Sequence, residues 1–146
     1  MRFRWDERLT ASIKFMDTEH QEILTEIQAV LGLVNFKIPC QGDIDRFISL
    51  EGSIRNHFDH EELLMRQYAY PKLEEHLLEH QRMMSKVRRF NELFYTTGIS
   101  EKQFQKVEHD IEFWFKTHIF EADRDLEMFV NKKQIEMCPN EEKTKC

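Results

Sequence analysis

Hydrophobic residues recur every three to four positions along most of the chain, which is the period of an amphipathic helix and not of a strand. The pattern predicts four helices, over residues 18–36, 43–68, 71–95 and 101–120. Helices of this length joined by short connections favour antiparallel neighbours. We therefore expect an all-α protein that folds as an up-down-up-down antiparallel four-helix bundle.

Polar residues at the predicted helix ends support these boundaries. Thr18 and Gln21 have the spacing of a capping box, and so do Ser100 and Gln103. Pro71 suits the first turn of a helix, because its fixed φ is helical and its missing N–H would have no partner there.

The segments outside the four helices are expected to differ in how they pack. Residues 1–16 are predicted to form an N-terminal arm, which three large apolar residues would hold on the bundle: Trp5, Phe15 and Met16. A short fifth helix near 125–133 is compatible with the pattern. The polar tail at 132–146 is expected to be loose.

Composition narrows the class of protein. A chain of 146 residues, 40% hydrophobic and 33% charged, is expected to be one soluble domain over residues 1–146. Its net charge of −6 argues against a nucleic-acid or membrane partner, and no apolar run is long enough for a membrane helix.

The N-terminus lacks the apolar segment of a secretory signal. Cys40, Cys138 and Cys146 are widely spaced and odd in number, which indicates reduced thiols and a cytoplasmic location.

Several core positions of the predicted helices carry a titratable side chain where the pattern requires an apolar one. They are His20 in the first helix, His57 and Glu61 in the second, His76 and His80 in the third, and His118 in the fourth. The bundle topology brings all of these positions to one end, in a single interior layer. Burying so many titratable groups without a metal would be costly, and pairs four residues apart on a helix commonly share a metal. The sequence therefore predicts a buried metal site.

Helix geometry separates three other titratable residues from this layer. His109 precedes His118 by nine residues, about half a turn around the helix, and is predicted to face solvent. His60 lies about 60° off the stripe and is expected to be partly exposed. Asp123 follows His118 by five residues, so it reaches the layer only if the helix ends or widens there, as in a π-type turn.

Together these residues resemble the hemerythrins, and most closely the bacterial single-domain forms. The pattern is His57-Phe-x-x-Glu61, Tyr70-Pro71, His76-x-x-x-His80 and Trp114-x-x-x-His118-Ile119-x-x-x-Asp123, with Asp17-x-x-His20 upstream. The match extends from Trp5 to Val130 and fills all seven ligand positions with the expected residue type.

The resemblance implies a non-haem di-iron centre that binds dioxygen reversibly. It assigns three histidines to one iron, two histidines to the other and two carboxylates to both: His76, His80 and His118; His20 and His57; and Glu61 and Asp123. These side chains supply nine donor atoms, and an oxo or hydroxo bridge fills one more position on each iron. Two octahedral ions are then left with one open position, on the iron with fewer histidines.

The resemblance also implies that apolar side chains line a dioxygen pocket over the open position: Phe58, Trp114, Phe115 and Ile119. Each is equally compatible with an ordinary core residue. Phe115 departs from the family, whose members commonly carry leucine there, and its larger ring could narrow access for the ligand.

The sequence favours reversible dioxygen binding for storage, transport or delivery by a protein that is not an enzyme. The ligand set is richer in imidazole than the sites of ferritin-like bundles, which favours binding over oxygen activation, and zinc prefers four ligands. Oxygen or redox sensing, iron handling, and a di-iron oxidase, peroxidase or nitric-oxide-consuming enzyme stay open as alternatives. Azide and nitric oxide are further candidate ligands, and the pattern leaves the oligomeric state open.

Overall fold

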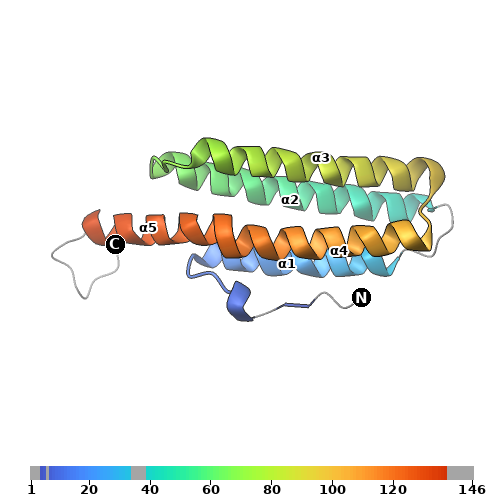
Figure 1. The fold of residues 1–146 in the computed structure, drawn as a ribbon, viewed down its shortest axis with the longest axis horizontal. Coiled ribbons are helices and arrows are strands. Elements are labelled where there is room, and N and C mark those ends of the chain that lie inside the picture. The colour runs from blue at the N-terminus through green and yellow to red at the C-terminus, as the bar shows by residue number, and fades with distance from the viewer. Residues whose placement is uncertain (1–3, 6, 34–38, 138–146) are drawn as a thin grey trace.

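The computed structural model describes residues 4–5, 7–33 and 39–137. This part of the chain is helical, with a 3-10 helix η1 (Glu7–Leu9), α1 (Lys14–Gly32), α2 (Gln41–Gln67), α3 (Leu73–Thr97), α4 (Glu101–His118), a π-helical segment η2 (Ile119–Asp123) and α5 (Arg124–Met137). Helices α1 to α4 lie along one long axis and successive helices run in opposite directions (Figure 1). The predicted antiparallel four-helix bundle with an N-terminal arm is confirmed. None of the described helices is long and apolar enough to cross a membrane.

Helix α1 begins four residues before the predicted start, so the capping box predicted at Thr18 is wrong. Ile13 is the N-cap residue and makes no side-chain cap hydrogen bond. Fully buried Met16 extends the apolar stripe by one turn toward the N-terminus, which explains the earlier start. The helix ends at Gly32, and residues 34–36 of the predicted helix lie outside the described part of the chain.

The start of α4 agrees with the prediction. The backbone N–H of Gln103 donates to the Ser100 hydroxyl, and the N–H of Ser100 donates to the Gln103 side chain at 2.9 Å, so the capping box is formed. Helix α3 starts at Leu73, two residues later than predicted, and Pro71 lies in the turn before it.

Helix α4 continues directly into η2 and α5, whereas the fourth helix was predicted to end near residue 120 (Figure 1). Residues 132–137 are helical, so the prediction of a loose tail is wrong for them, and residues 138–146 lie outside the described part. Leu126 and Val130 of α5 are buried against Met65 and Tyr70, and this apolar contact stabilises the extension.

The N-terminal arm packs on the bundle as predicted, but it ends before Lys14, so Phe15 and Met16 belong to α1 and not to the arm. Leu9 is fully buried, and Trp5 contacts the same core. The backbone N–H of Ser12 donates to the Glu127 carboxylate at 2.7 Å, which joins the arm to α5.

Two apolar clusters fill the bundle, one on each side of a polar layer. The smaller cluster contains Met16 and Met65 and lies at the end with the α2–α3 turn. The larger contains Ile23 and Ile54 and lies in the half nearer the α3–α4 turn. Along α1, His20 lies between Met16 and Ile23, so the polar residues lie between two apolar regions.

Candidate metal centre

Seven titratable side chains from five helical segments meet in the polar layer. Helix α1 supplies His20, α2 supplies His57 and Glu61, α3 supplies His76 and His80, α4 supplies His118, and η2 supplies Asp123. Each is at most 5% exposed. The structure thus brings together all seven residues that the sequence singled out.

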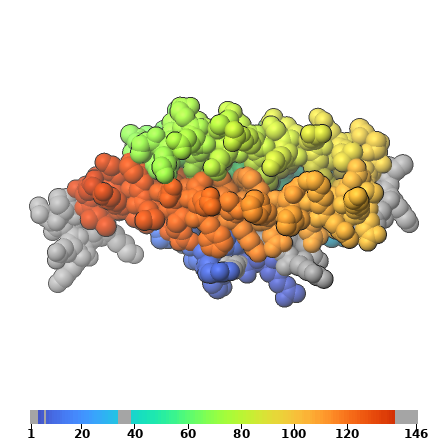
Figure 2. Space-filling view, in the orientation of Figure 1, coloured from blue at the N-terminus to red at the C-terminus, as the bar shows by residue number. Residues whose placement is uncertain are grey.

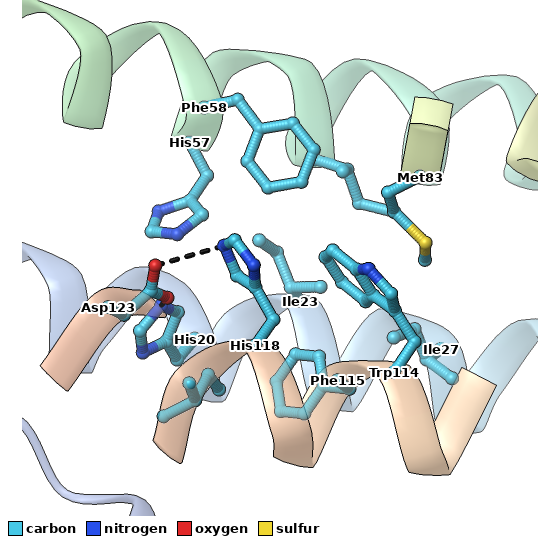
Figure 3. A pocket seen from close by; sticks show the side chains of 12 residues that line it. His20, Ile23, Ile27, His57, Phe58, Met83, Trp114, Phe115, His118 and Asp123 are labelled. Carbon is cyan, nitrogen blue, oxygen red and sulfur yellow. Dashed lines mark ion pairs between the residues drawn. The ribbon is translucent and has the colours of Figure 1, made fainter. Parts of the chain in front are cut away.

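The π-helical segment explains how Asp123 reaches the layer. In a π-type turn hydrogen bonds run from residue i to i+5, so residues five apart face the same side. Asp123 Oδ1 accordingly lies 2.9 Å from Nε2 of His118 (Figure 3). The condition that the sequence set for Asp123, a local widening of the helix, is met.

The ligating atoms fall into two groups that share both carboxylates. One group contains Glu61, His76, His80, His118 and Asp123, and the other contains His20, His57, Glu61 and Asp123. Within each group the candidate ligand atoms all lie within 4.8 Å of one another. This is the spacing of two adjacent cation sites with common carboxylate ligands.

Glu61 divides its two oxygens between the groups. Its Oε1 lies 2.8 Å from Nε2 of His57 and 3.6 Å from Nε2 of His20. Its Oε2 lies 3.1 Å from Nε2 of His76 and 3.0 Å from Nε2 of His80. Each oxygen therefore faces one group only, as in a bridging carboxylate.

Asp123 is arranged in the same way. Its Oδ2 lies 3.0 Å from Nε2 of His20. Its Oδ1 lies 3.2 Å from Nε2 of His76 and 2.9 Å from Nε2 of His118. All five histidines thus direct Nε2 at a carboxylate.

The protein alone leaves the layer's hydrogen-bonding capacity unsatisfied. Among the described residues, the buried side-chain polar atoms without a hydrogen-bond partner lie here, apart from the Tyr95 hydroxyl. They include Nε2 of His20, His57, His80 and His118. Buried polar atoms without partners are rare and costly, and imidazole with carboxylate is a donor set that iron accepts. The residues therefore fit a pair of bound cations.

Opposing effects set the protonation of the metal-free layer. Burial would lower the pKa of His57 and of His118, but the facing carboxylates reverse this and raise each pKa to about 10. The same balance raises the pKa of His76 to about 9, whereas burial prevails at His80 and lowers its pKa. Burial would raise the pKa of Glu61, but the histidines around it hold that pKa well below its usual range.

Two glutamates that the sequence analysis did not single out hold the other ring nitrogens. Nδ1 of His57 lies 3.2 Å from the Glu19 carboxylate, and Nδ1 of His118 lies 2.8 Å from the Glu79 carboxylate. A donor bond at Nδ1 leaves Nε2 free to bind a metal and fixes the ring orientation. Each glutamate directly precedes a candidate ligand in the chain, and this position is the one sign of its role in the sequence. The histidine that it contacts, however, lies on another helix.

His60 and His109 lie outside the layer, as predicted. The His60 side chain is 53% exposed, and its Nδ1 is 2.6 Å from Glu19. His109 is exposed on α4. Neither belongs to the two groups of candidate ligands.

Aromatic rings support two of the histidines. The Phe58 ring stacks on His80 with centroids 3.7 Å apart, and the Trp114 ring stacks on His118 at 4.8 Å. Stacking restricts imidazole rotation, so these two residues also help to orient candidate ligands.

A small apolar cavity of about 20 Å³ adjoins the layer (Figure 3). Both histidines of the two-histidine group, His20 and His57, line it, and so does His118. All four predicted pocket residues line it as well: Phe58, Trp114, Phe115 and Ile119. A space of this size holds about one water-sized molecule.

The fold and the layer define a helical-bundle protein built to bind cations with histidine and carboxylate. Residues 11–130 match the family model described as the hemerythrin HHE cation binding domain. Because this match covers most of the chain, the chain belongs to the hemerythrin family, which confirms the resemblance. It is similar to a protein named bacteriohemerythrin from Clostridium acetobutylicum, with 29% identity over 128 residues, which are 84% of this chain and 97% of the relative.

Proposed function

We propose that this chain binds two iron ions in the polar layer and binds dioxygen reversibly, for storage, transport or delivery and not for catalysis. One iron would be held by His76, His80 and His118, and the other by His20 and His57. Glu61 and Asp123 would bridge them. The name of the relative from Clostridium acetobutylicum, bacteriohemerythrin, supports this reading.

The observation that carries the proposal is the division of the carboxylate oxygens. Glu61 and Asp123 each turn one oxygen toward one histidine group and the other oxygen toward the second. A single-cation site needs no such division. The arrangement therefore supports two cations side by side, with a donor set of imidazole and carboxylate that suits iron.

The position of the small cavity supports a gas as the ligand. It touches both members of the two-histidine group, His20 and His57, where fewer protein donors are available. Its exposed lining is apolar, and the Phe115 ring packs edge-on to His20 with centroids 6.2 Å apart. Water would find no hydrogen-bond partner on this apolar lining, whereas the space admits a diatomic molecule.

When bound, the iron pair would supply the open position and the electrons that dioxygen binding requires. The protein's own part is to hold the imidazole rings in place and to keep the site dry. Glu19 and Glu79 orient His57 and His118 through Nδ1, and Phe115 closes the apolar side.

Optical spectroscopy of the reduced, iron-loaded chain tests the proposal. Metal analysis after anaerobic loading should give two irons per chain. A visible band should appear in air, disappear under argon and return over repeated cycles. Fewer than two irons, or oxygen consumption without recovery of the reduced protein, would overturn the proposal, and the second result would indicate an oxidase.

A further inference from the structure

A second cavity lies in the half of the bundle nearer the α3–α4 turn, and the metal centre does not use it. Its volume is about 400 Å³. The molecular surface is hollowed between α3 and α4, where teal atoms of α2 show at the floor (Figure 2). Helices α1 to α4 all contribute to its lining, which includes Leu31, Phe47, Val87, Phe90 and Val107.

A cavity of this size is unusual in a small bundle. Protein interiors are close-packed, and few of their voids exceed a water molecule. Sites for small organic molecules span about 300–1,000 Å³ and have mainly apolar walls, and this cavity has both properties. An alkyl chain would supply the packing contacts that the wall residues lack.

The mouth of the cavity is basic. Lys86 and Arg89 of α3 and Lys106 of α4 line it, together with a single carboxylate, Asp110. Lys106 forms an ion pair with Asp110. Lys86 and Arg89 are exposed, and among the described residues neither forms an ion pair with a carboxylate, unlike their neighbours Arg88 and Lys106. Two uncompensated cations thus stand beside an apolar cavity, in a chain whose net charge is −6.

We propose that this cavity binds a medium-chain monocarboxylate, with the alkyl chain in the apolar interior and the carboxylate at Lys86 and Arg89. A neutral apolar molecule would gain nothing from the cations, and an inorganic anion would leave the interior unfilled. Met83 and Trp114 line both this cavity and the small one beside the metal layer, so a bound alkyl chain would lie near Trp114. The site does not depend on the proposed dioxygen binding.

Titration of the full chain with decanoate, below its micelle concentration, tests the proposal. Calorimetry should give saturable binding of one decanoate per chain. Fluorescence in a Trp5→Phe background, where Trp114 is the one tryptophan left, should change with the same midpoint. Decanol, which has the same chain and no charge, should bind about tenfold more weakly, as loss of a charge-assisted contact predicts.

Variants separate the two parts of the site. Val107→Phe, which fills the cavity, should abolish decanoate binding. The double variant Lys86→Glu, Arg89→Glu should weaken decanoate about tenfold and leave decanol unchanged. Lys102→Glu, an exposed charge reversal on α4 at a residue that does not line the cavity, is the control and should change neither.

Four results would overturn the proposal. They are no saturable decanoate binding, equal affinity for decanoate and decanol, an equal loss in the Lys102→Glu control, and binding to anionic phospholipid vesicles without binding to free decanoate. If Val107→Phe does not fold, the charge-reversal pair and its control still decide the outcome.

Discussion

Replacing Glu79 by alanine should weaken iron binding while leaving the bundle folded. Nδ1 of His118 donates to the Glu79 carboxylate at 2.8 Å, and Nε2 of the same ring points at Asp123. Without Glu79 the ring can rotate, and its proton can move to the nitrogen that would bind iron. The loss therefore acts on a candidate ligand through its orientation and tautomer.

The size of the effect follows from the geometry. Outer partners of metal-binding histidines change metal affinity by about 10–100-fold, which corresponds to about 1.4–2.7 kcal/mol. The Glu79 side chain is 45% exposed, so its pairing should stabilise the metal-free fold by at most about 1 kcal/mol. Metal affinity should thus fall much more than stability.

Anaerobic competition with an iron(II) chelator measures the affinity, and urea unfolding of the metal-free protein measures stability. Glu79→Gln keeps an acceptor oxygen and should give an intermediate loss of affinity. Glu75→Ala, an exposed change one turn earlier on α3, controls for the lost charge. If Glu79→Ala binds iron as tightly as Glu75→Ala does, the assignment of Glu79 as a positioning residue is refuted.

Three further predictions address the site and its environment. His76→Ala should reduce iron below two per chain while exposed His109→Ala leaves it unchanged, and equal loss on metal analysis would disprove the assigned layer. Phe115→Ala should speed both dioxygen uptake and decay of the visible band in stopped-flow experiments. The variant must first be shown to fold, since a buried Phe→Ala change costs about 3–5 kcal/mol. Unchanged rates would show that Phe115 does not line the dioxygen pocket. The metal-free protein should lose stability as pH rises from 6 to 10, because the pKa values of His57 and His118 are raised to about 10. Their contribution is complete below the unfolded pKa of about 6.5 and disappears as pH passes through the folded value, so equal urea midpoints at pH 6 and pH 10 would contradict this account.

The core stripe and the bundle topology were enough to predict six members of the layer. His20, His57 and His118 each occupy an apolar register position, and the up-down order of the helices brings their ends together. This reasoning needs only the helical period and short connections. It is therefore insensitive to helix boundaries, and the wrong start predicted for α1 did not disturb it.

Asp123 shows where a fixed helical period fails. At 100° per residue it points away from His118, and the family pattern supplied its role before any geometry did. In the π-helical segment, Asp123 contacts histidines that α1, α3 and α4 bring to it. These are contacts between different helices, so the residues next to Asp123 in the sequence do not predict them.

Glu19 and Glu79 were missed for a related reason. Each is adjacent to a core residue and so lies about 100° off the apolar stripe, which marks it as solvated. Their partners are 38 and 39 residues away, on neighbouring helices. The position of a residue around its own helix indicates whether it enters the core. Whether its side chain contacts a histidine on a neighbouring helix depends on how the two helices are aligned along their axes.

The metal-free layer explains why cations would bind there with release of protons. Two buried carboxylates face five imidazoles, and three of these histidines have pKa values of about 9 to 10. At neutral pH, protons on these rings supply the positive charge that the carboxylates need. Two metal ions would supply positive charge in place of these protons and would in addition satisfy the Nε2 atoms that have no hydrogen-bond partner. Metal binding should therefore displace imidazole protons and strengthen as pH rises, whereas the stability of the metal-free bundle falls over the same range. The two states thus depend on pH in opposite directions, because protons and metal ions compete for the imidazole nitrogens of His57, His76 and His118.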